Sequence, residues 1–426
     1  MLILRGLIGL AVLVLLAWLL SSHRTRFPWR VVLWGYLLQI GLAFLVLRSE
    51  AGEAAIKGAA WVFKGIVSQA TGPVVTLFGQ GYADTQTHPA FGPGIAFAAS
   101  GLVIVIFFSS LMAVLYHLGV LQVVIWTLAR LLARVLGVSG AESMAIAANV
   151  FVGQTEAPLV IKPYLERLTR SELFAVMTGG FATIAGSVMA IYISMLGDEL
   201  GPHLFAASVM SAPAAFVFAK VIMPETEDPK TGAHMPLELN RTSTNLVDAA
   251  AQGATDGMRL WLNIIAMILA FVALVNLVNW PLSAWVLWEE PMSLSRIFGW
   301  VFAPLAWVIG ISSWQDCQVI GSLIGTKVAV NEFIAYLDLQ AIIDNGELED
   351  ERSGMMAAYM LCGFANFGSI GIQIGGIAAL VPSLRTKLAD IALRAMIAGL
   401  LASLATATVA GMFSSLSLTP PASVGG

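Results

Sequence analysis

Long apolar runs separated by short polar loops make up most of this chain. A helix needs about 20 apolar residues to cross the hydrocarbon core of a bilayer. Segments close to that length are predicted to span a membrane at 2–20, 31–48, 93–119, 173–196, 204–223, 258–286, 355–380 and 388–413. The first run is longer than the apolar core of a signal peptide and precedes no small-residue cleavage site, so we interpret it as a span.

The composition agrees with a membrane protein. Of the 426 residues, 58% are hydrophobic and 11% are charged, whereas soluble domains have roughly 45–50% and about 25%. These values exclude a soluble enzyme and a disordered chain. The net charge of −4, without a basic tract, excludes a nucleic-acid binder. The two cysteines and five histidines are scattered along the chain, so neither a disulfide framework nor a metal cluster is predicted.

The charges of the loops predict the orientation. Loops rich in Arg and Lys lie at 24–30, 130–134, 162–170 and 385–387, and acidic loops lie at 289–290 and 338–351. Cytoplasmic loops are enriched in positive residues. If both termini are external, the basic loops all lie on the cytoplasmic side and the acidic loops on the external side. Residues 224–256 are then an internal loop with a short surface helix. Residues 49–91 are external and include an interfacial helix at 53–70.

Two stretches of the chain have similar sequences in the same order. The matching pairs are 136–139 with 309–312, 153–156 with 325–327, 164–165 with 336–337, and 180–187 with 363–369. Basic residues flank the first stretch and acidic residues flank the second, so we expect the two copies to have opposite orientations in the membrane. Inverted repeats are typical of secondary transporters, whose substrate site lies between the repeats near the midplane.

Within each repeat one segment is too short to span the membrane. Residues 141–163 and 316–337 have charged flanks and polar residues halfway along. We predict that each is a re-entrant helical hairpin, with tips at Gly153–Glu156 and Gly325–Lys327 that meet from opposite faces. Non-helical backbone is tolerated at that depth only inside protein or beside a wet cavity. The predicted fold is all-α, with about eight spans and two hairpins in an inverted repeat.

Glu156 and Glu332 are the strongest candidates for chemistry. A charged side chain at a helix centre costs roughly 2.5–3.5 kcal/mol on insertion scales, so a carboxylate at membrane depth predicts a functional site. Lys327 could neutralise one of the two. Glu142 and Asp316 lie near the start of each hairpin, where acidic residues favour helix N-termini, and we expect both to act as caps.

Polar residues elsewhere in the repeats suggest what the site binds. Asn366 and Ser369 would share one face of a helix, either in a substrate site or as contacts between helices. Asn149 and Thr183 could supply side-chain oxygens to a sodium ion, together with carbonyls of broken helices. The hairpin tips contain no arginine, which favours a neutral ligand with hydroxyl and ring-nitrogen groups over an anion. A carrier for anionic amino acids and an intramembrane enzyme are the alternatives.

Three segments resemble the signature segments of concentrative nucleoside transporters. They are Asn149–Tyr164, Gly321–Tyr336 and Cys362–Ser369. The resemblance extends over the chain beyond the first span, in the same order. It implies an inner-membrane homotrimer that imports nucleosides by sodium symport with an elevator-type mechanism. Sodium would be the coupling ion, no other cofactor is implied, and coupling to protons is the alternative.

The resemblance also assigns roles to residues. Those facing the nucleobase would be Gln154, Thr155, Glu156 and Val188. Those facing the ribose would be Glu332, Asn366 and Ser369, with Phe364 as an apolar wall. Sodium would bind Asn149, Thr183 and the carbonyls of Val152 and Ile184. Serine is expected at position 183, and threonine keeps the hydroxyl.

Four regions follow from the same resemblance. Residues 1–119 would hold N-terminal scaffold spans, and 120–223 the first repeat of the transport domain, which begins with an interfacial helix. Residues 224–292 would hold the cytoplasmic loop and a long scaffold helix, and 293–416 the second repeat. Both termini would be periplasmic. A choice between purines and pyrimidines stays open.

Overall fold

The computed structural model describes residues 2–78, 103–201, 203–232, 243–287 and 290–414. Its α-helices are α1 (Leu2–Leu19), α2 (Trp29–Arg48), α3 (Glu50–Phe78), α6 (Ile104–His117), α7 (Val120–Leu136), α8 (Gly140–Asn149), α9 (Ala157–Val160), α10 (Arg170–Ala182), α11 (Gly186–Leu200), α12 (His203–Ile222), α13 (Leu246–Leu282), α14 (Leu294–Val308), α15 (Trp314–Ala329), α16 (Glu332–Asp344), α17 (Glu351–Leu361), α18 (Phe367–Leu380) and α19 (Arg385–Phe413). Two 3₁₀ helices, η2 (Lys162–Arg167) and η3 (Pro382–Leu384), and a two-stranded ribbon of β1 (Val286–Leu287) and β2 (Glu290–Pro291) complete the described elements.

Most predicted spans are helices of membrane-crossing length. Among the described residues, six helices are long and apolar enough to cross a bilayer, or seven if the bent pair α6 and α7 is one span. Two of the eight expected spans account for the difference. The span at 93–119 is described only from residue 103, and the span at 355–380 is divided into α17 and α18, of 11 and 14 residues.

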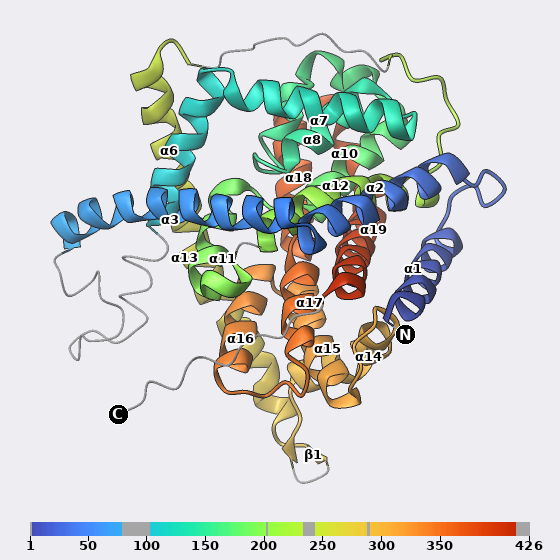
Figure 1. The fold of residues 1–426 in the computed structure, drawn as a ribbon, viewed down its shortest axis with the longest axis vertical. Helices are drawn as coiled ribbons and strands as arrows, with labels where there is room; N and C mark the ends of the chain where they lie inside the picture. Colours follow the sequence, from blue (N-terminus) through green and yellow to red (C-terminus); the bar gives the residue numbers. More distant parts are fainter. Residues whose placement is uncertain (1, 79–102, 202, 233–242, 288–289, 415–426) are drawn as a thin grey trace.

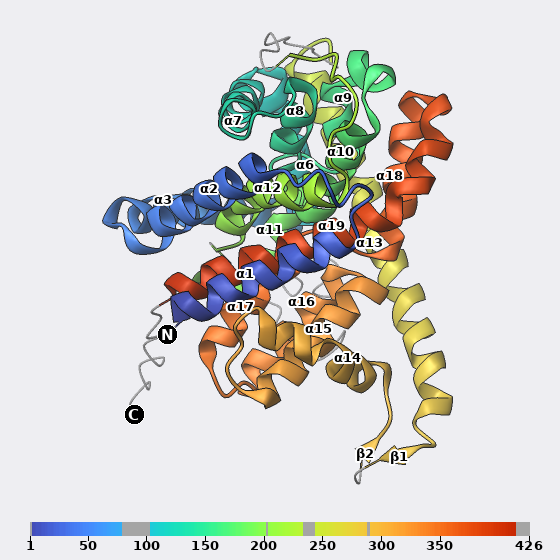
Figure 2. The same cartoon turned by 90° about the vertical axis from the view of Figure 1, so that its right-hand side faces the viewer.

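The helices repeat in order. The series α7, α8, α9 with η2, α10, α11 and α12 matches the series α14, α15, α16, α17, α18 and α19. In both views the first series begins at one end of the molecule and the second at the other, as expected for inverted repeats (Figures 1 and 2). A glycine with positive φ follows the first helix of each series, Gly137 at 73° and Gly310 at 111°. This conformation, which favours glycine, ends the helix and turns the chain into the hairpin.

Helices α12 and α19 form the centre of the molecule. In each of them, 89% of the most apolar segment is buried within the protein. They pack on each other, and α10, α17 and α1 pack on α19 while α2 packs on α12. Helix α13 contrasts with them, because none of its most apolar segment is buried. It packs along α6 at the side of the molecule (Figure 1).

Residues 233–242, on which part of the prediction of a surface helix falls, lie outside the described residues, and the described parts of 224–256 contain no separate surface helix. From Leu246 onward these residues form the first turns of α13, which continues to Leu282. The Asn245 side chain caps this helix by accepting a hydrogen bond from the Asp248 N–H at 2.9 Å, so the helix begins there rather than at residue 258, where the span was expected. The interfacial helix expected at 53–70 is also longer, since α3 extends over Glu50–Phe78.

Candidate functional site

Hairpin 1 consists of α8, an irregular tip at residues 150–156, and the short helices α9 and η2. At its base, the expectation that Glu142 caps a helix is confirmed, because its Oε1 accepts the Ser139 N–H at 2.9 Å. The same carboxylate forms an ion pair of 2.7 Å with Lys220 at the end of α12. Both side chains are buried. This pair fixes the hairpin to the central bundle.

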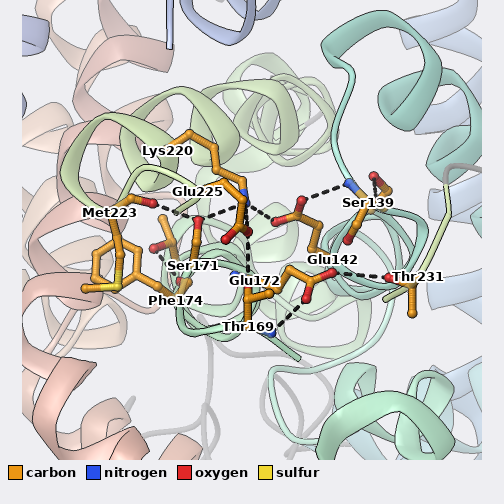
Figure 3. Close-up of polar contacts among 12 residues, drawn as sticks. Ser139, Glu142, Thr169, Ser171, Glu172, Phe174, Lys220, Met223, Glu225 and Thr231 are labelled. Atoms are coloured by element: carbon orange, nitrogen blue, oxygen red, sulfur yellow. Dashed lines mark hydrogen bonds and ion pairs between the residues drawn. The ribbon is translucent and has the colours of Figure 1, made fainter. Parts of the chain in front are cut away.

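Further polar contacts surround that ion pair (Figure 3). Lys220 also donates to the Ser171 hydroxyl at 3.0 Å and lies 3.8 Å from Glu225. Thr169 caps α10 in a reciprocal capping box with Glu172. The start of α10, the base of hairpin 1 and the segment after α12 are thereby joined into one buried polar cluster.

Hairpin 2 consists of α15 and α16, joined through Val330 and Asn331. The predicted tip at Gly325–Lys327 is wrong, because these residues lie within α15. The break comes three residues later, where the Asn331 side chain accepts the Ile334 N–H at 2.9 Å and caps α16. This cap places Glu332 in the first turn of α16, where the helix dipole stabilises a carboxylate.

Two charged residues of hairpin 2 differ from expectation. Lys327 has no carboxylate within ion-pair distance among the described residues. Its ammonium donates to the Met360 carbonyl at 2.7 Å and to the Ser403 hydroxyl at 3.3 Å, since the end of α17 leaves carbonyls without helical partners. Asp316 does not cap its own helix. It accepts hydrogen bonds from the N–H groups of Glu349 and Asp350 and from the Ser353 hydroxyl, and so holds the loop before α17.

Both long helices facing the hairpins are broken, as predicted. Residues 183–185 separate α10 from α11, and residues 362–366 separate α17 from α18. In the second break Gly363 has φ of 126°, and a Cβ there would lie 2.7 Å from the Phe181 carbonyl oxygen. The first break therefore packs directly against the second.

A continuous set of hydrogen bonds connects the two repeats. Asn366 caps α18, since its Oδ1 accepts the Ser369 N–H at 2.8 Å, and its Nδ2 donates to Glu332 Oε2 at 2.9 Å. Asn366 and Ser369 are thus related as cap and first turn rather than as neighbours on one helix face. The second oxygen of Glu332 accepts the Tyr192 hydroxyl at 2.9 Å. Tyr192 belongs to the first repeat and Glu332 to the second.

The tip of hairpin 1 joins the same set. Gln154 Nε2 donates to the Ser369 hydroxyl at 3.4 Å, and Gln373 Nε2 donates to Gln154 Oε1 at 3.0 Å and to the Met177 carbonyl at 3.2 Å. We name this connected set the cross-repeat network, and its residues, in the order of their contacts, are Tyr192, Glu332, Asn366, Ser369, Gln154 and Gln373. It joins both broken helices to both hairpins.

The remaining expected substrate residues lie around this network. Thr155 faces α18, because a Cβ on Gly376 would lie 2.9 Å from its methyl carbon. Glu156 is exposed, with its carboxylate over Gly153. Val188 is buried in the first turn of α11, and Phe364 is half-buried in the second break.

Oxygen atoms suited to a cation gather where hairpin 1 meets the first break. Asn149 Oδ1 is buried with no hydrogen-bond partner among the described residues. The Thr183 hydroxyl shares its proton between the Gly179 carbonyl at 2.9 Å and the Asn149 carbonyl at 3.1 Å. In the part of the chain that is described, no main-chain N–H donates to the carbonyls of Val152 or Ile184. Unpaired buried oxygens are costly unless a further partner binds them, so this set fits a cation ligand shell.

Sequence reasoning missed Tyr192 and Gln373. Gln373 carried a signal, because it is a lone carboxamide in the apolar run of α18. Tyr192 carried none, since a tyrosine in an apolar helix is most often part of the core.

Comparisons with known proteins agree with this architecture. Family models match residues 8–80 (Na+ dependent nucleoside transporter N-terminus), 99–199 (Nucleoside recognition) and 203–411 (Na+ dependent nucleoside transporter C-terminus). An uncharacterized transporter of Haemophilus influenzae is 43% identical over 415 residues, covering 96% of this chain and 98% of that protein. The nucleoside permease NupC of Helicobacter pylori is 39% identical over 412 residues, covering 96% and 97%. Mouse solute carrier family 28 member 3 is 42% identical over 425 residues, but the chain spans 58% of its length.

Solved structures match over nearly the whole chain. CNTnw in an inward-facing substrate-bound state has a TM-score of 0.90 and 40% identity, covering 98% of this chain and 99% of that one. A variant of CNTnw in an outward-facing state has a TM-score of 0.88, covering 97% and 98%. The fold is thus that of a transporter solved in more than one state.

Proposed function

Because the chain belongs to the Na+-dependent nucleoside transporter family, we propose that it imports nucleosides such as uridine by symport with sodium. The family is one of transporters and not of enzymes. The cross-repeat network is the observation that carries the proposal. It gathers a carboxylate, three carboxamides and two hydroxyls from both repeats at one place within an apolar protein.

The chemistry of that set suits a nucleoside. A nucleoside has no phosphate, so its hydroxyls and base edge need donors and acceptors rather than arginines. In our proposal Glu332, Asn366 and Ser369 bind the ribose, and Gln154, Thr155 and Glu156 bind the base. Val188 and Phe364 would form apolar walls. A site built to bond hydroxyls rejects analogues that lack them, because its buried polar groups then stay unpaired.

Sodium would bind beside this site. Asn149, Thr183 and the carbonyls of Val152 and Ile184 belong to hairpin 1 and the first break, and the Gly186 N–H joins the two through the Phe151 carbonyl at 3.0 Å. An ion bound there would order the irregular tip that presents Gln154, Thr155 and Glu156. Ion and substrate would each favour the same conformation, which is thermodynamic coupling.

Packing supports an elevator-type division of the protein into a static and a moving unit. Cβ atoms on Gly253 and Gly257 of α13 would lie 2.5 Å and 2.6 Å from main-chain atoms of α6, so these two helices are in close contact. We propose that α3, α6 and α13 form the static scaffold. Helices α1 and α2 pack on α19 and α12, so we assign them to the moving unit rather than to the scaffold expected from the sequence.

The exposed face of α13 supports an oligomer. A 37-residue helix whose most apolar segment contains no fully buried residue needs lipid or other subunits around it. We propose a homotrimer in the bacterial inner membrane, with both termini on the periplasmic side.

Uridine uptake into proteoliposomes tests the function. With an inward sodium gradient, the purified protein should accumulate radiolabelled uridine above the external concentration, and empty liposomes should not. Uptake that is independent of sodium but driven by an inward proton gradient would show that protons, and not sodium, are the coupling ion. Uptake independent of both gradients would overturn symport. Competition by unlabelled nucleosides would then rank purines against pyrimidines.

A further inference from the structure

Tyr192 is a fully buried hydroxyl that the proposed transport mechanism does not yet use. It lies on α11, in the first repeat, and donates to Glu332 of hairpin 2 at 2.9 Å. Its ring is held from the side of hairpin 2. The ring centroid of Tyr336 lies 4.4 Å away at an interplanar angle of 32°, and that of Phe333 lies 6.0 Å away. The phenol therefore has one fixed direction, toward the carboxylate.

Glu332 is held at both oxygens and keeps acceptor capacity for further donors. Tyr192 donates to one oxygen, and Asn366 donates to the other at 2.9 Å. An ionised carboxylate offers about four acceptor positions, so each oxygen keeps one for another donor. The amide of Asn366 is itself fixed, because its Oδ1 caps α18. Two donors on opposite oxygens prevent the carboxylate from rotating about its terminal bond.

We propose that Tyr192 is a positioning residue that fixes Glu332 to accept two neighbouring hydroxyls, and so sets the preference for ribose over deoxyribose. This inference rests on the proposed function, in which Glu332 binds the sugar. Without the phenol, Asn366 alone holds the carboxylate, which then rotates and offers its acceptors in varying directions. Substrates with both hydroxyls lose the most binding, because they need both acceptors of Glu332 at once.

The chain supplies a matched control. Tyr336 lies in the same stack and is equally buried, but its hydroxyl donates to the Ala358 carbonyl at 2.8 Å and not to the carboxylate. Tyr192→Phe and Tyr336→Phe thus remove the same atom from neighbouring buried rings. A general weakening of the fold would follow from either, whereas misdirection of Glu332 would follow only from the first.

The experiment compares uptake kinetics of uridine, 2′-deoxyuridine and 3′-deoxyuridine in proteoliposomes for the wild type and the two variants. For Tyr192→Phe we expect the uridine KM to rise about tenfold, as for loss of one hydrogen bond to a charged group. The KM of each deoxy analogue, which lacks one of the two hydroxyls bound by Glu332, should rise less than about threefold, and the sodium half-saturation should stay unchanged. Tyr336→Phe should leave the KM values of all three nucleosides near those of the wild type.

Each other outcome contradicts a defined claim. Equal KM increases for uridine and both analogues in Tyr192→Phe, or the same selective loss in Tyr336→Phe, would overturn the positioning role. If the wild type transports none of the three nucleosides, the proposed function fails and this inference fails with it. If Tyr192→Phe is not monodisperse on gel filtration, Tyr192→His and Tyr336→His are compared instead, by the ratio of each variant's KM to that of the wild type for each nucleoside. Equal ratios in that pair would likewise overturn the positioning role.

Discussion

The two hairpins occupy equivalent places in the repeats but turn in different ways. Hairpin 1 passes through the irregular residues 150–156 between α8 and the four-residue helix α9. Hairpin 2 needs only Val330 and Asn331 between α15 and the 13-residue helix α16. Both of these turn residues are buried, whereas Glu156 in hairpin 1 is exposed.

The two tips are suited to different tasks. An irregular tip leaves main-chain carbonyls without helical partners, which is what a cation needs. A tight tip capped by Asn331 holds Glu332 at a helix N-terminus, and Tyr192 and Asn366 fix its direction. We infer that hairpin 1 is the part that sodium orders, and hairpin 2 the part that is already ordered before any ligand binds.

The bases of the hairpins differ as well. Hairpin 1 is anchored by the buried ion pair of Glu142 and Lys220. Hairpin 2 is anchored by Asp316, which accepts hydrogen bonds from two main-chain N–H groups and from Ser353. One anchor depends on a single cation, and the other is distributed over three neutral donors.

The largest expected effect comes from breaking the first anchor. Lys220→Met leaves Glu142 buried without its cation, and the free energy of unfolding should fall by about 3–5 kcal/mol. Chemical unfolding in mixed micelles measures it. The double variant Lys220→Met with Glu142→Gln removes both charges and should recover more than half of the loss. A loss below about 1 kcal/mol in the single variant would show that the pair does not anchor the hairpin.

The two tip carboxylates should respond differently to neutralisation. Glu332→Gln should lower uridine uptake at low substrate about a hundredfold and the free energy of unfolding by about 1–3 kcal/mol, because one of the two buried donors, Tyr192 or Asn366, then faces an NH2 group instead of an acceptor. Glu156→Gln should lower uptake about tenfold and leave the unfolding midpoint unchanged, because Glu156 is exposed. Both variants should remain folded oligomers. Full uptake in either variant would remove that carboxylate from the substrate site.

Sequence reasoning predicted the hairpins, the broken helices and the repeat, because polar residues interrupt apolar runs at the same places in both copies. It placed the tip of hairpin 2 wrongly because Gly325, Thr326 and Lys327 look like a break. They stay helical because Lys327 reaches the Met360 carbonyl and Ser403, more than thirty residues away in sequence. Such partners depend on tertiary packing and leave no local pattern.

The candidate site was predictable to a similar degree. Gln154, Glu332, Asn366 and Ser369 stood out, and the structure connects them. Tyr192 did not stand out, because its role comes from a carboxylate in the other repeat.

The sodium dependence of uptake tests the inference that sodium orders hairpin 1. Asn149→Ala removes the buried oxygen that has no partner among the described residues. The sodium half-saturation of uptake should rise about tenfold, as for loss of one ligand oxygen. The increase in Tm that sodium produces in the wild type should shrink, because binding stabilises the folded state by mass action. Ser353→Ala is the control, since among the described residues its hydroxyl forms one hydrogen bond, to Asp316 in the anchor of hairpin 2. An unchanged sodium dependence in Asn149→Ala would move the ion site elsewhere.

The smallest effect is expected where hairpin 2 is anchored. Ser353→Ala removes one of three donors to Asp316, while the N–H groups of Glu349 and Asp350 remain at 2.9 Å and 3.2 Å. The free energy of unfolding should fall by about 1 kcal/mol, as for a single hydrogen bond, and the uridine KM should not change. A distributed anchor predicts this small loss, because no single donor leaves the carboxylate unpaired. A loss as large as that of Lys220→Met would show instead that hairpin 2 also depends on one contact, and the contrast between the two anchors would disappear.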